Sequence, residues 1–152
     1  MSAASAWHLA QINIGRIRGS MDSPVMAEFA AALDAINALA ESTRGFVWRL
    51  KDSSGNATSI HAFPDPFTLV NMSVWTDLGS LQEYVYRSMH GKFFARRMEW
   101  FEKFDGPHVA LWWIPVDHIP TVDEGKTRLE MLAARGPTAD AFTFRESFPA
   151  PG

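Results

Sequence analysis

Polar and apolar residues alternate in short stretches along this chain, which is the pattern of strands that bury one face. The stretches are residues 6–14 (AWHLAQINI), 46–51 (FVWRLK), 57–63 (ATSIHAF), 67–75 (FTLVNMSVW) and 107–115 (PHVALWWIP). Turn-forming residues at 52–56 and 64–66 lie between them. The pattern predicts four main strands, with residues 57–63 as the hairpin partner of the second. Residues 141–148 are expected to form a final short strand or an extended tail.

Three helices are predicted between and after these strands. Apolar residues at helical spacing mark the first over residues 23–43, with Ser23 as its N-cap. The second follows Asp77, which can cap it, and is kinked or divided at Gly91. The third begins at TVDE, residues 121–124, a capping box in which a Thr hydroxyl and a Glu carboxylate each accept the other's backbone N–H.

The order of elements is strand, helix, two or three strands, helix, strand, and then a further helix with a tail. This order is typical of a ferredoxin-like α+β subunit with an antiparallel sheet and a C-terminal addition. A chain of 152 residues suits a single domain. We expect its core over residues 6–115 and the extension over residues 116–152.

Composition narrows the partners and the compartment. Hydrophobic residues make up 47% and charged residues 20%, which is ordinary for a globular protein. A net charge of -3 gives no electrostatic case for nucleic acid or an anionic membrane. The absence of cysteine excludes disulfides and thiol nucleophiles and fits a reducing cytoplasm. The N-terminus lacks the features of a signal peptide, and no apolar run nears the ~20 residues of a membrane span, so we expect a cytoplasmic protein.

Most catalytic motifs are missing from the sequence. No pair among the five histidines has the i, i+3 or i, i+4 spacing of a helical metal site, and we expect no protein-ligated metal. There is no G-x-S-x-G for a hydrolase. The glycine-containing stretch GRIRG, residues 15–19, lacks both phosphate-binding patterns.

Polar side chains at positions that would normally be apolar are the remaining candidates for chemistry. In NMSVW, residues 71–75, alternation places Asn71, Ser73 and Trp75 on one face of the strand. The others are Asn13 at the end of the first strand, Asn37 beside the apolar stripe of the first helix, and His90 with Arg97 on the second helix. An unpaired buried amide or imidazole costs about 1–3 kcal/mol, so each needs a partner. The set predicts either a pocket between the sheet and two helices, or groups that pair with one another and fix the fold.

Seven colinear stretches over roughly residues 7–151 together resemble domain-of-unknown-function family 3291, an uncharacterised bacterial family. They are HLAQINIGRI, MAEFAAALDAINALAESTRGFVWRL, NATSIHAF, LVNMSVW, YRSMHGKFFARRMEWF, HVALWWIP and FTFRESFPAP. That family is similar to the dimeric α+β barrel superfamily, which includes antibiotic biosynthesis monooxygenases. The resemblance implies a ferredoxin-like subunit whose sheet pairs with that of a second copy. A sheet with helices on one face also leaves its other face to bury, so we expect a homodimer.

The resemblance also implies roles for three residues. Oxygenase members of the superfamily often carry an Asn near the end of the first strand, a Trp at the end of an inner strand, and a His or Arg on the following helix. Asn13, Trp75 and His90 occupy those places here. The helix between Trp75 and His90 is longer than in the haem-degrading relatives, and the C-terminal extension is a further departure.

The function favoured by these features is a cofactor-independent monooxygenase that acts on an aromatic or polyketide-type small molecule. Tryptophan rings would stack on the substrate, amides would donate to a developing oxyanion, and an imidazole would act as general base. An arginine, Arg97 or Arg49, would hold the anionic form. The catalytic residues expected are His90, Asn13 and Trp75, and the substrate-binding residues expected are Asn71, Ser73, Trp48, Asn37 and Arg97.

Other functions fit the same residues. An isomerase or a cyclase could use the same acid–base and oxyanion groups. A haem protein with His90 as axial ligand is one alternative, because aromatic residues follow that histidine on the helix. A non-catalytic small-ligand-binding or stress-associated dimer is another, since a tryptophan-lined pocket needs no acid–base pair.

Overall fold

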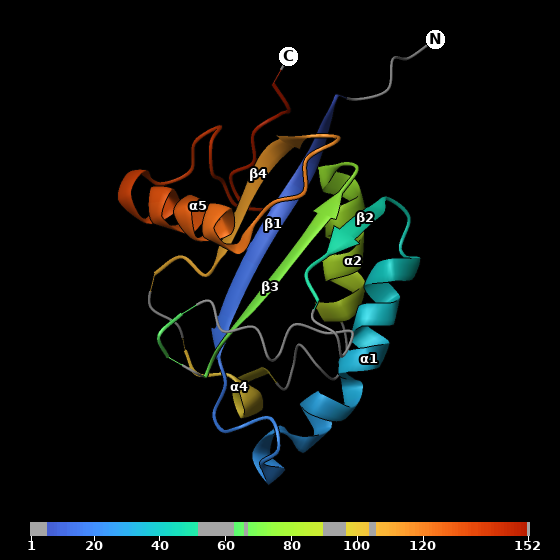
Figure 1. Ribbon diagram of the computed structural model, residues 1–152, viewed down its shortest axis with the longest axis vertical. Coiled ribbons are helices and arrows are strands. Elements are labelled where there is room, and N and C mark those ends of the chain that lie inside the picture. Colours follow the sequence, from blue (N-terminus) through green and yellow to red (C-terminus); the bar gives the residue numbers. More distant parts are fainter. Residues whose placement is uncertain (1–5, 52–62, 66, 90–96, 104–105, 152) are drawn as a thin grey trace.

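The structure, a computed structural model, describes residues 6–51, 63–65, 67–89, 97–103 and 106–151, with backbone alone at residues 88, 89 and 97. Its centre is an antiparallel four-stranded sheet in the order β2-β3-β1-β4 (Figure 1). The strands are β1 (Trp7–Arg16), β2 (Phe46–Arg49), β3 (Thr68–Trp75) and β4 (Val109–Pro115). With a helix between β1 and β2 and another between β3 and β4, this order is that of the predicted ferredoxin-like α+β fold.

Helices lie at the positions that the sequence predicts. They are the 3-10 turn η1 (Pro24–Met26), α1 (Ala27–Ser42), α2 (Leu78–Met89), α4 (Arg97–Trp100) and α5 (Val122–Arg135). Ser23 occupies the predicted cap position but makes no capping bond, because its hydroxyl donates to the backbone oxygen of Ser20. Asp77 does cap α2: its carboxylate accepts the backbone N–H of Ser80 at 2.7 Å, and this bond lowers the pKa of Asp77.

Some boundaries differ from the prediction or fall outside the described residues. β1 continues two residues past its predicted end at residue 14, because Gly15 and Arg16 pair with Leu69 and Thr68 of β3. The predicted hairpin partner, residues 57–63, lies outside the described residues except for Phe63. Gly91, the expected break in the second helix, lies outside them as well.

The two faces of the sheet are covered by different helices of the same chain. One face, here called the α5 face, carries Ile12, Met72 and Trp112, which form one core cluster with Leu129 and Leu132 of α5. The other, here called the ladder face, belongs to a second cluster, which joins strand residues to α1 and α2. In Figure 1, α5 lies beside β4 and β1, whereas α1 and α2 lie together beside β2 and β3.

Coverage of the α5 face corrects one argument made from the sequence. We expected the second face of the sheet to need a partner chain, but α5 packs against it from within the same chain. Ile12 and Met72 are fully buried there. A Cβ atom added at Gly125 of α5 would lie only 2.8 Å from the Cδ1 atom of Ile12, so helix and sheet are in close contact. The homodimer stays a prediction, without this physical reason for it.

The tail after α5 returns to the sheet. Phe142 forms an isolated antiparallel bridge with Leu111 of β4, with N–H···O distances of 2.8 and 2.9 Å. Further along, the indole N–H of Trp113 donates to the backbone oxygen of Phe148 at 2.9 Å. The tail is therefore extended and bound to β4, in agreement with the predicted short strand or extended segment.

Candidate functional site

Polar side chains of β1 and β3 meet on the ladder face, between the two central strands. Register explains their meeting, since Asn13 lies opposite Asn71 and Gln11 lies opposite Ser73. Side chains of directly opposed residues in an antiparallel pair stand on the same face and within contact distance. We call the connected set the amide ladder, and its members are Gln11, Asn13, Asn71, Ser73 and Trp75.

Hydrogen bonds run through the amide ladder from the core to the surface. The indole N–H of Trp75 donates to the Ser73 hydroxyl oxygen at 2.8 Å, and the Gln11 amide donates to the same oxygen at 2.7 Å. Gln11 also donates to the side-chain oxygen of Asn71 at 2.8 Å. Trp75, Ser73 and Gln11 are buried, Asn13 is half-buried and Asn71 is exposed. The ladder therefore opens to solvent at its Asn71 end.

The Asn71 amide lies with its oxygen toward the ladder and its nitrogen away from it. Its oxygen accepts from Gln11 and also from the Asn13 amide, the latter at 3.1 Å, while Asn13 donates to the Gln11 side-chain oxygen at 3.0 Å. With the Gln11 and Asn13 amides oriented as they are, turning the Asn71 amide alone would set its NH₂ group against two other donors. Its two N–H groups therefore point away from the ladder, and no partner for them is present among the described residues. An exposed donor held in this way can stabilise a negative charge on a bound molecule.

Trp75 anchors the closed end of the ladder. Its ring stacks on Tyr84 of α2, with centroids 5.2 Å apart and planes at 21°, and meets the ring of Phe46 edge-on at 5.5 Å. The side chain is fully buried. Protein rings therefore occupy the surface that we expected to stack on a substrate, and Trp75 acts on the ladder through its indole N–H.

Trp48 lies on the opposite face of the sheet from Trp75. A β-bulge between Phe46 and Trp48 shifts the register of β2, so that Phe46 pairs with Trp75 but Trp48 pairs with Val74. Trp48 consequently packs against the cluster of the α5 face. The structure does not bring the two expected stacking tryptophans together, because the bulge reverses which face Trp48 joins.

The same bulge brings Arg49 to the ladder face, opposite Ser73. Its side chain is buried, and its guanidinium donates to the Glu41 carboxylate of α1 at 3.2 Å. Burial raises the pKa of the nearby Tyr84 phenol, and the charge of Arg49 partly opposes that rise. Arg49 therefore places a cation, paired with the Glu41 carboxylate, on the same face as the ladder.

The remaining expected site residues are placed only in part. Asn37 is buried on α1, and no hydrogen bond of its side chain is present among the described residues. His90 lies outside the described residues, and so does the side chain of Arg97. Gln11 was not expected as a site residue. The alternation in β1 nevertheless places it on the same face as Trp7 and Asn13.

Neither a metal site nor a membrane-spanning helix is found in the part of the chain that the structure describes. No group of three or more His, Asp or Glu side chains there could hold a metal ion. No helix among those residues combines the length and the apolar character needed to cross a membrane.

Solved structures with a similar arrangement include three at low sequence identity. A protein of unknown function from Nitrosomonas europaea, NE2512, is 13% identical, covers 76% of this chain and 95% of its own, and has a TM-score of 0.45. SnoaB, a cofactor-independent oxygenase from Streptomyces nogalater, is 14% identical in a mutant form, with 74% and 95% covered and a TM-score of 0.44. Rv0793 from Mycobacterium tuberculosis is 16% identical, with 74% and 99% covered and a TM-score of 0.46.

Sequence comparison places the chain in a family. No curated protein matches it. A family model, however, matches residues 8–152, nearly the full length of the 152 residues. The chain thus belongs to the family described as Domain of unknown function (DUF3291), as the colinear stretches predicted.

Proposed function

We propose that this protein is a small-molecule enzyme of the cofactor-independent monooxygenase type, acting on an aromatic or polyketide-type substrate with an acidic hydroxyl. The observation that carries the proposal is the outward-pointing amide of Asn71 at the open end of the ladder. A phenolate or enolate bound there would receive hydrogen bonds from two N–H groups whose direction the protein has already fixed. Such preorganised donors favour the anion without reorganising during the reaction.

The reaction needs an electron-rich anion and no outside reductant. Once deprotonated, the substrate can pass an electron to O₂, and the resulting radical pair can combine to a peroxide at carbon. Loss of water from a peroxide formed at a ring CH₂ group leaves a carbonyl. Overall, CH₂ and O₂ become C=O and H₂O, so the substrate supplies all the electrons that dioxygen takes up.

Each ladder residue has a distinct part in this proposal. Asn71 contacts the substrate oxyanion, and Asn13 and Gln11 hold the Asn71 amide in place. Ser73 joins Gln11 to the buried indole of Trp75, which makes Trp75 a positioning residue. Arg49, buried on the same face and paired with Glu41, is the nearer cation proposed for the anionic form of a bound phenol. His90 is the proposed general base, Asn37 a further amide for the substrate, and Arg97 a second cation for its anionic form.

Oxygen consumption with a panel of hydroxyanthrones and hydroquinones tests the proposal. Asn71→Ala should lower kcat by about 10²–10³, the usual effect of losing one oxyanion donor. Asn71→Asp keeps the shape but sets a carboxylate against the anion, so it should be at least as damaging. Gln82→Ala removes an exposed amide from α2 and serves as the control. If the wild-type protein consumes no oxygen with any compound of the panel, the proposal is overturned.

A second candidate is a non-catalytic small-ligand-binding protein. The internal pairing of the ladder and the complete burial of Trp75 favour it, because both fix the fold without any reaction. Tight binding of a panel compound without turnover would support this candidate. The haem alternative depends on His90. It predicts that a Soret band develops on titration with haem and that His90→Ala abolishes this band.

We keep the homodimer as part of the proposed function, with one condition set by the fold. Two copies that pair while α5 stays in place must use a surface other than the α5 face. Sedimentation equilibrium at micromolar concentration measures the state directly, and a mass of 17.0 kDa at every concentration would remove the dimer from the proposal.

A further inference from the structure

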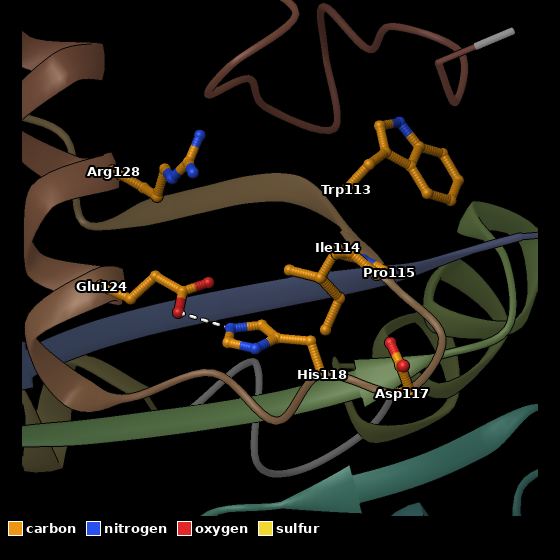
Figure 2. Close-up of a pocket in the computed structure, with 7 residues that line it drawn as sticks. All are labelled: Trp113, Ile114, Pro115, Asp117, His118, Glu124 and Arg128. Atoms are coloured by element: carbon orange, nitrogen blue, oxygen red, sulfur yellow. Dashed lines mark hydrogen bonds and ion pairs between the residues drawn. The ribbon is translucent and has the colours of Figure 1, made fainter.

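A pocket of about 500 Å³ lies where β4 passes into α5, away from the amide ladder. Figure 2 shows the side chains around it, which come from the end of β4, the loop after it and the first two turns of α5. The residues that line it are Trp113, Ile114, Pro115, Asp117, His118, Glu124 and Arg128. Apolar and charged groups therefore share one open pocket at the edge of the sheet.

A histidine and a carboxylate are joined in the middle of this pocket. One oxygen of Glu124 lies 2.7 Å from the Nε2 atom of His118, and the other accepts the indole N–H of Trp112 at 3.0 Å. Burial alone would raise the pKa of Glu124, but the bonds with His118 and Trp112 outweigh it, and the pKa lies below its ordinary value. Glu124 is therefore ionised at neutral pH, and both of its oxygens are held.

The ionised carboxylate fixes the tautomer of His118. Because Glu124 can only accept, the Nε2 atom of His118 must carry the proton that lies between them. In the neutral imidazole the Nδ1 atom then has a lone pair and accepts hydrogen bonds. The backbone N–H of His118 donates to the oxygen of Pro115 at 3.0 Å, which holds the loop in place.

The helix start does not require the Glu124 carboxylate. In a capping box the side chain of this glutamate returns to the backbone N–H of the N-cap residue. Here the Thr121 hydroxyl accepts the N–H of Glu124 at 3.1 Å, but the carboxylate oxygens are bound to His118, which lines the pocket, and to the buried Trp112. Only half of the predicted capping box forms, and the other half serves the pocket.

Arg128 lies one helical turn beyond Glu124 and places a positive charge at the pocket. Its guanidinium lies 5.9 Å from the centre of the Trp112 ring and donates one bond, of 2.7 Å, to the backbone oxygen of Asp140. A guanidinium has five N–H groups, and the remaining ones have no other partner in the described part of the chain. In Figure 2, Arg128 and Glu124 project from α5 on one side of the drawn site and Asp117 stands on the other, with His118 between Glu124 and Asp117.

We propose that this pocket binds a small aromatic monocarboxylic acid that carries a hydroxyl group. The carboxylate pairs with the planar guanidinium of Arg128, which suits two-oxygen anions. The ring lies against the exposed Pro115, and the hydroxyl donates to Nδ1 of His118. Asp117 and Glu124 repel a second carboxylate, so a monocarboxylate is selected over a dicarboxylate. This proposal is independent of the proposed oxygenase reaction, because the two sites share no residue.

Isothermal titration of the full-length protein with 4-hydroxybenzoate, benzoate and phenol tests the proposal. We expect 4-hydroxybenzoate to bind with a Kd of about 1 mM or tighter. Benzoate, which lacks the hydroxyl, should bind roughly 5- to 10-fold more weakly, and phenol should not saturate. Arg128→Gln should weaken 4-hydroxybenzoate at least ~10-fold. Arg135→Gln, an exposed arginine at the end of the same helix, should leave the Kd unchanged.

The position of binding is read separately from indole N–H signals in two-dimensional NMR. On addition of 4-hydroxybenzoate, the signals of Trp112 and Trp113 should shift, while that of Trp75 stays in place. Each signal is assigned by a Trp→Phe substitution. Equal weakening by Arg128→Gln and Arg135→Gln, or a shift at Trp75 alone, would overturn the proposal, as would the absence of saturable binding. None of these results depends on oxygen uptake, so the two proposals fail separately.

Discussion

Ser73 shows how much a single small side chain can hold together in this sheet. Its hydroxyl oxygen accepts hydrogen bonds from the Trp75 indole and the Gln11 amide, and all three side chains are buried. Without that oxygen, two donors would lose their partner in a place that water does not reach. An unsatisfied buried donor costs more than its hydrogen bond contributes when formed. The chemistry proposed at Asn71 therefore depends on Ser73 as a positioning residue.

We predict that Ser73→Ala lowers the free energy of unfolding by about 1–3 kcal/mol for each stranded donor. Part of this loss comes from the indole N–H of Trp75, so removing that N–H by a second substitution should recover part of the stability. Trp75→Phe removes the indole N–H, and Ser73→Ala should cost less in the Trp75→Phe background than in the wild type. Urea unfolding of the four proteins measures the coupling. Strictly additive effects would contradict the bond between Ser73 and Trp75.

The lowered pKa of Glu124 predicts how the stability of the protein depends on pH. Its pKa is lowered in the folded protein from an ordinary value of 4.5. A group whose pKa is lower when folded adds stability above the unfolded pKa, and that stability is lost as the pH falls through the folded pKa. The wild type should therefore be more stable than Glu124→Gln above pH 4.5, and the difference should shrink below it.

Chemical denaturation of both proteins between pH 2 and about 7 follows this difference directly. Glu130→Gln, which removes an exposed glutamate from the same helix, gives the matched comparison. A difference between wild type and Glu124→Gln that stayed constant down to pH 2 would mean that Glu124 is not the titrating group.

At the scale of elements, α5 is attached to the sheet by a narrow apolar stripe. Gly125, Leu129 and Leu132 are its buried residues, and they recur at the three- and four-residue spacing that places side chains on one face. Gly125 lets the first turn approach Ile12 and Met72 closely. The helix therefore lies on the sheet through its sequence pattern, and this position carries Glu124 and Arg128 to the pocket.

Leu129→Ala should destabilise the protein by about 2–5 kcal/mol, the usual effect of truncating a buried leucine. Because Arg128 adjoins this leucine, the substitution should also weaken 4-hydroxybenzoate binding while the wild-type strand order is kept. Glu130→Ala, at the exposed neighbouring position, should do neither. Urea unfolding and titration measure the two effects, and a change below ~0.5 kcal/mol for Leu129→Ala would argue against the docked position of α5.

For the whole molecule, the central point is that one chain covers both faces of its sheet. The ladder face is covered by α1 and α2, and the other face by α5. Trp112 and Ile114 of β4 are buried without any partner chain. Folding of the sheet should therefore be an intramolecular process, whatever state of association the protein adopts.

Dilution tests this expectation. At concentrations low enough for the protein to sediment at 17.0 kDa, its far-ultraviolet circular dichroism and tryptophan fluorescence should be those of the concentrated sample. Unfolding on dilution would instead show that a second chain is needed to cover the sheet, because association then stabilises the folded state by mass action.

The sequence alone determined the main strands, the helices, their order and the shared face of Asn71, Ser73 and Trp75. These follow from side-chain periodicity and from caps such as Asp77, which depend on residues within a few positions of each other. Periodicity could not place Trp48, because the bulge in β2 exists only relative to β3. Nor could it show that Tyr84 covers Trp75, since that contact depends on where α2 packs.

Only the tertiary structure decided which polar groups meet. Gln11 and Ser73 are 62 residues apart, and their hydrogen bond depends on strand register, which sums many weak side-chain preferences over the whole sheet. His118 is one of the five histidines that lack metal-site spacing in the sequence, and its contact with Glu124 is visible only in the folded chain. The chain sequence thus determined which side chains are available for chemistry, and the packing of α5 and the sheet determined their partners, because hydrogen bonds form between groups that are close in space.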